Sequence, residues 1–136
     1  MNDTKHSPAA TDFRKNYPAE YRTRDGRFVR SKSEGRIADW LYDHDIRYEY
    51  ERKLADGIVC DFYLPDIDTY IEFWGREDST YKAIRKKKEE FYSRNKYKLL
   101  SLEEKDVKRI DDVLWKELER RGLSISAKRA GSPILG

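Results

Sequence analysis

Residues 57–75 read GIVCDFYLPDIDTYIEFWG, and this stretch decides the fold. Two runs rich in branched and aromatic residues, GIVCDFYL and TYIEFWG, flank a short segment of turn-forming residues from Pro65 to Asp68. Such runs, bounded by turn residues, are typical of paired strands. If the loop covers these four residues, the strands form an antiparallel hairpin and Asp61 lies directly opposite Glu72.

Two facing acids favour a metal site. Directly opposed residues of antiparallel strands point to the same face, and like charges there destabilise the pair unless something offsets them. A divalent cation is the natural offset, and carboxylate oxygens suit the hard ions Mg²⁺ and Mn²⁺. The alternative is a different register, or an ion pair of Asp61 or Glu72 with an arginine on an exposed face. Cys60 alternates with Asp61, so we expect it to face away from that acid as a small core residue.

Hydrophobic periodicity predicts a helix, three strands, a helix, a strand and a final helix along the chain. This order, α-β-β-β-α-β-α, predicts the α/β class, with a central mixed four-stranded sheet flanked by helices. Besides the hairpin, the expected elements are a helix from Ser31 or Ser33 to about His44, a strand over 46–54, a basic helix over 81–96, a strand over 97–102 and an amphipathic helix over 107–122.

The composition predicts one domain with an aromatic core. The chain has 136 residues, of which 40% are charged and 13% aromatic, so aromatic side chains must supply much of the core. We place the domain at residues 21–121, between a flexible leader over 1–20 and a flexible tail over 122–136. A single cysteine excludes an internal disulfide, and no apolar run reaches the length of a signal peptide or membrane span. We therefore expect a cytoplasmic, intracellular protein without a membrane partner.

Glu34 is a third candidate acid. It lies on the same helical face as Ile37, Ala38 and Leu41, so an acid opens a stripe that should point into the domain. An equally strong interpretation is a capping box, in which Ser31 binds the start of the helix and Glu34 only returns a hydrogen bond. The sequence alone leaves both interpretations open.

Lys88 is a candidate partner for these acids from the basic helix. It lies four residues after Ile84 and four before Tyr92, in the middle of the apolar stripe, whereas Lys86 and Lys87 point elsewhere. If the helix covers the sheet face that bears the acids, its ammonium can stabilise negative charge near the metal. The alternative is that Lys88 extends along the apolar surface to reach water.

The order of these residues resembles the PD-(D/E)XK nuclease superfamily, which has the restriction-endonuclease-like fold. Its pattern is an acid on a first helix, an Asp in the second strand, and a Glu in the next strand with a Lys two residues on. Glu34 in VRSKSEGRIADWL, Asp61 in CDFYLP and Glu72 in YIEFWG match the three acids in order. Residues 25–118 are similar to compact nuclease domains found alone or fused to superfamily-one helicases, and to very-short-patch-repair endonucleases.

Two positions depart from the family pattern. Cys60 stands where the superfamily has the Pro that gives it its name, a position without a chemical role. Trp74 stands where the third-strand Lys is expected. In the subgroup that this chain resembles, the Lys has moved to the following helix, and Lys88, with Tyr92 four residues later, matches that position. Arg85 is the next candidate.

The resemblance implies a Mg²⁺- or Mn²⁺-dependent endonuclease that hydrolyses phosphodiester bonds in DNA, directed by structure rather than by a long sequence. It implies Asp61 and Glu72 as metal ligands, Glu34 as an auxiliary or water-mediated ligand, the Phe73 carbonyl as a further ligand, and Lys88 as the catalytic lysine. The implied partners are DNA, a helicase or another repair or recombination protein, and a second copy of the chain as in a homodimer.

Two basic segments are candidates for contacts with nucleic acid. Eight Lys or Arg residues lie between residues 81 and 98, and such clusters can neutralise phosphates and release counterions. The alternative is a solvated amphipathic helix with internal acidic partners. A second basic cluster, from Arg22 to Lys32, precedes the first helix. The residues that we assign to nucleic-acid binding are Arg30, Lys32, Lys82, Arg85, Lys86 and Lys87.

Two other functions compete with the nuclease. One is a catalytically inactive nuclease-fold module that binds nucleic acid through the same basic surfaces, and Trp74 at the lysine position is its best support. The other is an unrelated α/β interaction domain in which the acids are surface charges.

Overall fold

A computed structural model describes residues 17–126 of the chain. It confirms an α/β architecture in which helices flank a four-stranded mixed sheet. The elements in chain order are β1 (Tyr21–Arg22), β2 (Phe28–Val29), α2 (Lys32–Asp43), β3 (Glu49–Lys53), η2 (Ala55–Gly57), β4 (Val59–Leu64), η3 (Pro65–Ile67), β5 (Thr69–Trp74), α3 (Ser79–Arg94), β6 (Lys98–Glu103), α4 (Glu104–Val107) and α5 (Ile110–Arg120).

The sheet has the strand order β3-β4-β5-β6. Strands β3, β4 and β5 pair antiparallel, and β6 pairs parallel to β5 after the crossover through α3. Every residue of β5 is buried, because this strand has a neighbour on both edges and helices on both faces. Side chains of β5 therefore enter two separate interiors, one on each face of the sheet.

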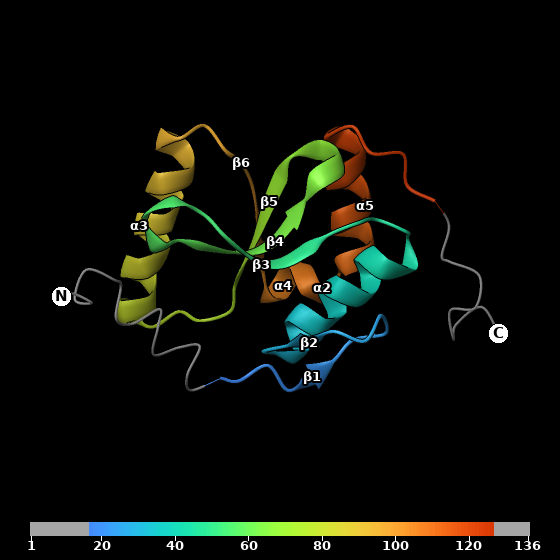
Figure 1. Cartoon of the computed structure of the whole chain (residues 1–136), viewed down its shortest axis with the longest axis horizontal. Helices are drawn as coiled ribbons and strands as arrows, with labels where there is room; N and C mark the ends of the chain where they lie inside the picture. The colour runs from blue at the N-terminus through green and yellow to red at the C-terminus, as the bar shows by residue number, and fades with distance from the viewer. Residues whose placement is uncertain (1–16, 127–136) are drawn as a thin grey trace.

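Helix α3 covers one face of the sheet, while α2, α4 and α5 lie on the other (Figure 1). The interior under α2 and α5 is the larger and is mostly aliphatic. The interior under α3 is smaller and mostly aromatic, as the composition predicts. The larger cluster includes Ile37, Leu41, Phe62, Leu64, Ile71, Phe73, Leu100, Leu102, Leu114 and Leu118, and the smaller includes Cys60, Tyr70, Phe91 and Tyr92.

The predicted hairpin register is confirmed along the outer part of β4 and β5. Leu64 pairs with Thr69, and Phe62 pairs with Ile71, as expected for a loop from Pro65 to Asp68. Asp68 closes the loop in the left-handed region, at φ 48°. The paired positions end at Phe62–Ile71, one step before the level of Asp61 and Glu72. The two acids are thus close neighbours where the ladder opens, and not a regular opposed pair.

The pleat of β3 and β4 is interrupted at Asp61. The β3–β4 pairing skips the level at which Asp61 would face Glu51, and Glu51 has a φ of 57°, in the left-handed region that non-glycine residues rarely adopt. On one side of this level Phe62 enters the larger interior, whereas on the other side Cys60 enters the aromatic interior under α3. The prediction that Cys60 is a buried core residue is confirmed. Its expected direction is wrong, because it shares the face of Glu72.

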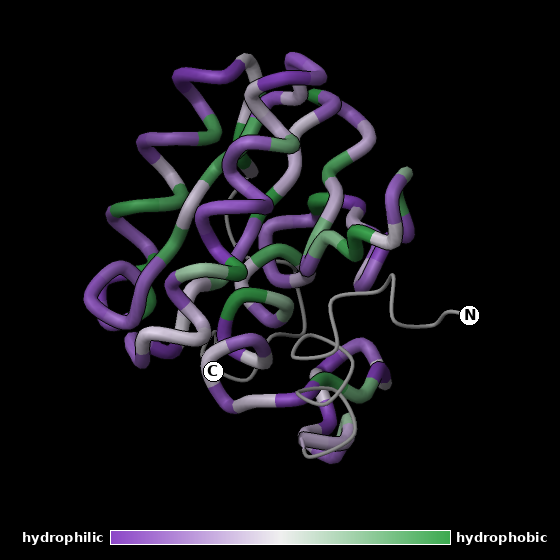
Figure 2. Tube along the Cα trace, turned by 90° about the vertical axis from the view of Figure 1, so that its left-hand side faces the viewer, coloured by the Kyte–Doolittle hydropathy of each residue, from purple (hydrophilic) through white to green (hydrophobic). Residues whose placement is uncertain are grey.

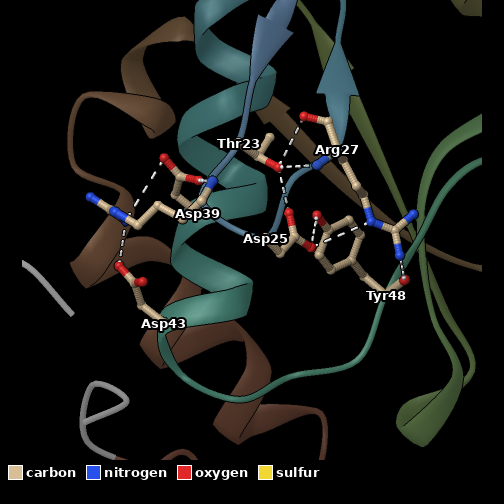
Figure 3. A network of polar contacts seen from close by, with 7 residues as sticks. Thr23, Asp25, Arg27, Asp39, Asp43 and Tyr48 are labelled. Carbon is tan, nitrogen blue, oxygen red and sulfur yellow. Dashed lines mark hydrogen bonds and ion pairs between the residues drawn. The ribbon is translucent and has the colours of Figure 1, made fainter. Parts of the chain in front are cut away.

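A short hairpin, β1–β2, precedes α2 and was missing from the predicted element order. Figure 3 shows the polar network that holds its turn. Asp25 accepts hydrogen bonds from the Thr23 hydroxyl and from the Tyr48 hydroxyl, the latter at 2.9 Å. The Arg27 guanidinium lies 4.6 Å from the centre of the Tyr48 ring. Since Tyr48 directly precedes β3, these contacts join the hairpin to the edge of the sheet.

Arg24 fixes the same hairpin to α2 through Asp39 and Asp43, both labelled in Figure 3. Its backbone N–H donates to Asp39 Oδ1 at 2.8 Å, and its guanidinium donates to Asp43 Oδ2 at 2.6 Å. Val29 of β2 is fully buried against the first turn of α2. Two-residue strands are too short to be stable alone, so this hairpin depends on its contacts with α2 and β3.

The packed unit continues beyond α5. Leu123 and Ile125 pack against the larger interior, and the carbonyl of Ser126 lies 2.7 Å from His44 Nδ1. His44 caps the C-terminus of α2 and is buried between Trp40 and Trp115. Residues 122–126, predicted as the start of a flexible tail, therefore lie against the domain. Residues 1–16 of the predicted leader and 127–136 of the predicted tail lie outside the described residues.

The surface over α3 is strongly polar. Figure 2, which looks onto the side where α3 lies, shows hydrophilic residues predominating along the trace. Of the helices within residues 17–126, none is long and apolar enough to cross a membrane.

Removal of the α2 cap tests the start of this helix. Ser31 accepts a hydrogen bond from the Glu34 N–H at 3.1 Å, so we expect Ser31→Ala to lower the free energy of unfolding by about 1 kcal/mol. Urea unfolding measures this loss. Ser33→Ala, which removes an exposed bond to Glu104, is the control and should cost less than about 0.5 kcal/mol. Equal losses in the two variants would contradict the capping role.

Candidate functional site: three acids and a buried lysine

Helix α2 brings Glu34 to the edge of the sheet. The side chain is 6% exposed, and its Oε1 accepts hydrogen bonds from the Tyr50 hydroxyl at 2.6 Å and from the Arg30 N–H at 3.1 Å. Ser31 caps the helix, as a capping box predicts. Glu34 does bind a backbone N–H at the helix start, but it also points inward and contacts β3 through Tyr50. Both interpretations of this acid are therefore correct in part.

Asp61 lies at the break in the β-ladder, in a half-buried position. Its Oδ2 accepts a hydrogen bond from the backbone N–H of Phe73 at 2.8 Å. This bond takes the place of a regular pairing between β4 and β5 at the level of Glu72. The carboxylate of Asp61 is thereby held beside the strand that carries Glu72.

Glu72 is 1% exposed and has two donors from α3. Its Oε2 lies 2.7 Å from Lys88 Nζ and accepts a hydrogen bond from the Tyr92 hydroxyl at 2.6 Å. Lys88 Nζ also donates to the carbonyl of Val59 at 2.9 Å. Since the side chain of Lys88 is 14% exposed, it points inward and does not extend to water. The prediction from the helical face, that Lys88 points towards the acids, is thus confirmed.

The pKa values of the acids indicate that the three carboxylates lie within electrostatic reach of one another. Burial, followed by repulsion from the Asp61 charge, raises the pKa of Glu34 to about 7. The same two causes raise the pKa of Glu72 to about 8, against the opposing effects of Lys88 and Tyr92. The negative charge of Asp61 contributes to the raised pKa of both Glu34 and Glu72. A cation placed among these acids would lower the free-energy cost of burying their charges and would weaken their mutual repulsion.

Three tyrosines donate to the oxygen atoms of the candidate site. Tyr50 donates to Glu34, Tyr92 donates to Glu72, and the Tyr81 hydroxyl donates to the Phe73 carbonyl at 3.4 Å. Sequence reasoning used Tyr92 only as a motif position and did not find the other two. The i, i+4 spacing of Lys88 and Tyr92 was the sequence signal that Tyr92 lies beside Lys88. The contacts of Tyr50 and Tyr81 depend on tertiary packing.

Trp74 occupies the strand position where a lysine was expected. The side chain is 3% exposed and lies on the α3 face, as alternation from Glu72 requires. The Arg85 guanidinium is 4.8 Å from the centre of its ring, and Lys88 Nζ is 5.7 Å away. Its Nε1–H is buried and has no hydrogen-bond partner within residues 17–126. Trp74 thus packs beside Lys88 of α3.

The residues assigned to nucleic-acid binding fall into two groups. Lys32, Lys82, Lys86 and Lys87 are exposed. Arg30 instead forms a two-point contact with Glu51, at 2.6 and 3.1 Å, and Arg85 pairs with both Glu89 and Glu103 at 3.0 Å. The exposed lysines can meet a phosphate directly, whereas the two arginines have internal partners.

Among the described residues, Asp, Glu, His and Cys side chains are nowhere gathered in a group of three or more that could hold a metal ion as they stand. The donors near Asp61 nevertheless have the right chemistry for Mg²⁺ or Mn²⁺, because all are oxygens. The hydrogen bonds described above use Glu34 Oε1, Asp61 Oδ2 and Glu72 Oε2. The second oxygen of each carboxylate is the atom that a cation would use.

Comparison with protein-family models, with curated proteins and with solved structures finds no match for this chain. The fold and the site geometry must therefore carry the functional argument. Three neighbouring acids and one partly buried lysine on a mixed sheet are the features from which we infer function.

The raised pKa of Glu34 predicts a pH-dependent stability. An acid with a folded pKa of about 7 and an unfolded pKa near 4.5 destabilises the fold as pH rises through that interval. Without divalent ions, we expect Glu34→Gln to match the wild type near pH 5. Near pH 8 we expect the variant to be more stable by about 1–3 kcal/mol.

Urea unfolding in EDTA at the two pH values measures this difference. Ser33→Ala changes the same helical turn without touching a carboxylate, and it should follow the wild type at both pH values. A difference between Glu34→Gln and the wild type that does not change with pH would contradict a raised pKa at Glu34.

Proposed function

We propose that this chain is a metal-dependent endonuclease with a restriction-endonuclease-like fold, which hydrolyses phosphodiester bonds in DNA. The single observation that carries the proposal is the contact between Glu72 and Lys88 beside Asp61. A fully buried carboxylate, a second acid close enough to raise its pKa, and a partly buried ammonium at 2.7 Å are a costly combination. Groups of this kind are characteristic of functional sites.

Asp61 and Glu72 are the residues that would hold Mg²⁺ or Mn²⁺, with Glu34 and the Phe73 carbonyl as further donors. When bound, such an ion polarises a phosphoryl oxygen and lowers the pKa of a bound water. Hydrogen bonds from Tyr50, Tyr92 and the Phe73 N–H fix the carboxylates of Glu34, Glu72 and Asp61, which would hold the ion. Partners of this kind hold ligand geometry and are as important as the ligands themselves.

Lys88 is the residue that would stabilise negative charge on the reacting phosphate. Its ammonium is held by Glu72 and by the Val59 carbonyl, so its position is fixed before any substrate arrives. A fixed cation in a site that excludes water stabilises developing charge without reorganisation. Trp74 supports this position, because its ring packs against both Lys88 and Arg85.

The exposed lysines of α3 would bind the DNA backbone. Lys82, Lys86 and Lys87 project from the helix that also supplies Lys88, so phosphate contacts and the candidate site share one element. Contacts to phosphates set position but do not read sequence. Such contacts favour substrates recognised by structure. We expect the chain to act on them within the cell, together with a helicase or another repair or recombination protein. A second copy of the chain would allow both strands to be cut.

A catalytically inactive module that binds nucleic acid is the second candidate function. Trp74 at the expected lysine position favours it. This candidate shares the exposed lysines with the nuclease. The two differ in whether any metal supports cleavage.

Cleavage assays test the nuclease directly. We expect the wild-type chain to cut plasmid or branched DNA with Mg²⁺ or Mn²⁺, and not in EDTA. Asp61→Asn and Glu72→Gln should abolish cutting, and Lys88→Ala should reduce it by about 100-fold or more. Glu119→Gln and Lys116→Ala, which change exposed residues of α5, are matched controls and should keep full activity.

Circular dichroism and the melting temperature must show that each variant is folded. Full activity in either acid variant would disprove the metal site. Full activity in Lys88→Ala together with loss in Arg85→Ala would move the lysine role to Arg85. A wild type that binds DNA but cuts no substrate with any of these metals would favour the inactive module.

A further inference from the structure

The β1–β2 hairpin displays large aromatic side chains to solvent. Within residues 17–126, the large hydrophobic side chains that are exposed are Tyr17, Tyr21 and Phe28, at 50%, 41% and 50%. All three lie between residues 17 and 28, whereas the other aromatic side chains within residues 17–126 are buried or partly buried. Exposed aromatic groups that cluster in this way mark a surface for binding.

This hairpin lies next to the candidate site. Val29 packs so closely on α2 that a Cβ at Gly35 would be 3.8 Å from Val29 Cγ2. The next residue, Arg30, donates its backbone N–H to Glu34 at 3.1 Å. Phe28 is two residues from Arg30, so their Cα atoms are at most about 7 Å apart. Phe28 is thus joined to Glu34 by a short stretch of chain and one hydrogen bond.

Arg22 provides the charge that accompanies this ring. It pairs with Phe28 across the hairpin, and its guanidinium lies 5.6 Å from the centre of the ring. Arg22 is exposed and forms no ion pair with an acid of residues 17–126. Arg24 and Arg27 differ, because they pair with Asp43 and Asp25. The surface therefore combines an exposed aromatic ring with a guanidinium that no acid within residues 17–126 neutralises.

We propose that the hairpin surface formed by Arg22 and Phe28 stacks unpaired bases of a nucleic acid bound at the candidate site. Aromatic rings and arginine planes are the groups on which single-stranded bases stack, while an arginine also attracts the phosphates. Stacked bases in a duplex do not offer their faces to such rings. The proposal rests on the proposed nuclease function and narrows its substrates to DNA with unpaired nucleotides beside the cut.

The hairpin is rigid enough for this role. The network of Thr23, Asp25 and Tyr48 holds its turn, and Arg24 ties it to two acids of α2 (Figure 3). These contacts use the side chains of the turn and leave Tyr21, Arg22 and Phe28 at the surface. A preformed stacking surface does not have to be ordered when the ligand binds.

Fluorescence anisotropy of the full chain in Ca²⁺, with labelled oligothymidine and a duplex of equal length, tests the proposal. We expect Phe28→Ala to weaken binding of the single strand about tenfold and binding of the duplex less than twofold. Phe28→Trp should keep the wild-type affinity, because it keeps a stacking ring. Arg22→Ala should weaken binding of the single strand, whereas Arg120→Ala, an exposed arginine of α5, should not.

A 2-aminopurine in the single strand reports stacking directly. Its fluorescence should be quenched by the wild type and by Phe28→Trp, but not by Phe28→Ala. Equal affinities of Phe28→Ala and the wild type for the single strand would overturn the proposal while leaving the nuclease intact. A concentration-dependent dimer that Phe28→Ala abolishes would assign the surface to a second copy and also overturn it. A wild type that neither binds nor cuts any nucleic acid would remove the nuclease as well.

Discussion

Glu72 places a carboxylate in the interior of the domain, on a strand that has neighbours on both edges. A buried charge costs several kcal/mol unless it is paired and hydrogen-bonded, so the surrounding structure must supply partners. Lys88 and Tyr92, one turn apart on α3, supply them at 2.7 and 2.6 Å. This requirement sets the position of α3 on the sheet. Removal of Lys88 would leave the Glu72 charge without compensation, whereas removal of Tyr92 would take away one of its hydrogen bonds.

The same constraint explains the irregular backbone nearby. A regular ladder would oppose Asp61 and Glu72 at close range in the interior, where two like charges repel strongly. The break at Glu51 and Asp61 turns the Asp61 carboxylate to the backbone N–H of Phe73 instead. Arg30 balances Glu51 at this point with a two-point contact. The strained φ of Glu51 is thus part of an arrangement that separates the site acids Glu34, Asp61 and Glu72. They nevertheless remain within electrostatic reach of one another.

Much of this arrangement could be predicted from the sequence, because periodicity and loop length depend on local residues. The register of β4 and β5 followed from the four-residue loop, and the inward direction of Lys88 followed from its helical face. The β1–β2 hairpin could not be predicted, since two-residue strands are too short to show an alternation of hydrophobic and polar residues. Nor could the reversed face of Cys60, which depends on the backbone angle of a residue in the neighbouring strand. The ion pairs of Arg85 likewise depend on tertiary contacts.

The three tryptophans are divided between the two faces of the sheet. Trp74 lies under α3, with two cationic groups against its ring and an indole N–H that has no partner within residues 17–126. Trp40 and Trp115 lie on the other face, with ring centres 6.4 Å apart. Indole emission responds to nearby charge, so one fluorophore of this chain senses the electric field at the acids. The other two report on the opposite core and serve as an internal reference, so the emission of the unmodified protein can test whether an ion or a phosphate binds beside the acids.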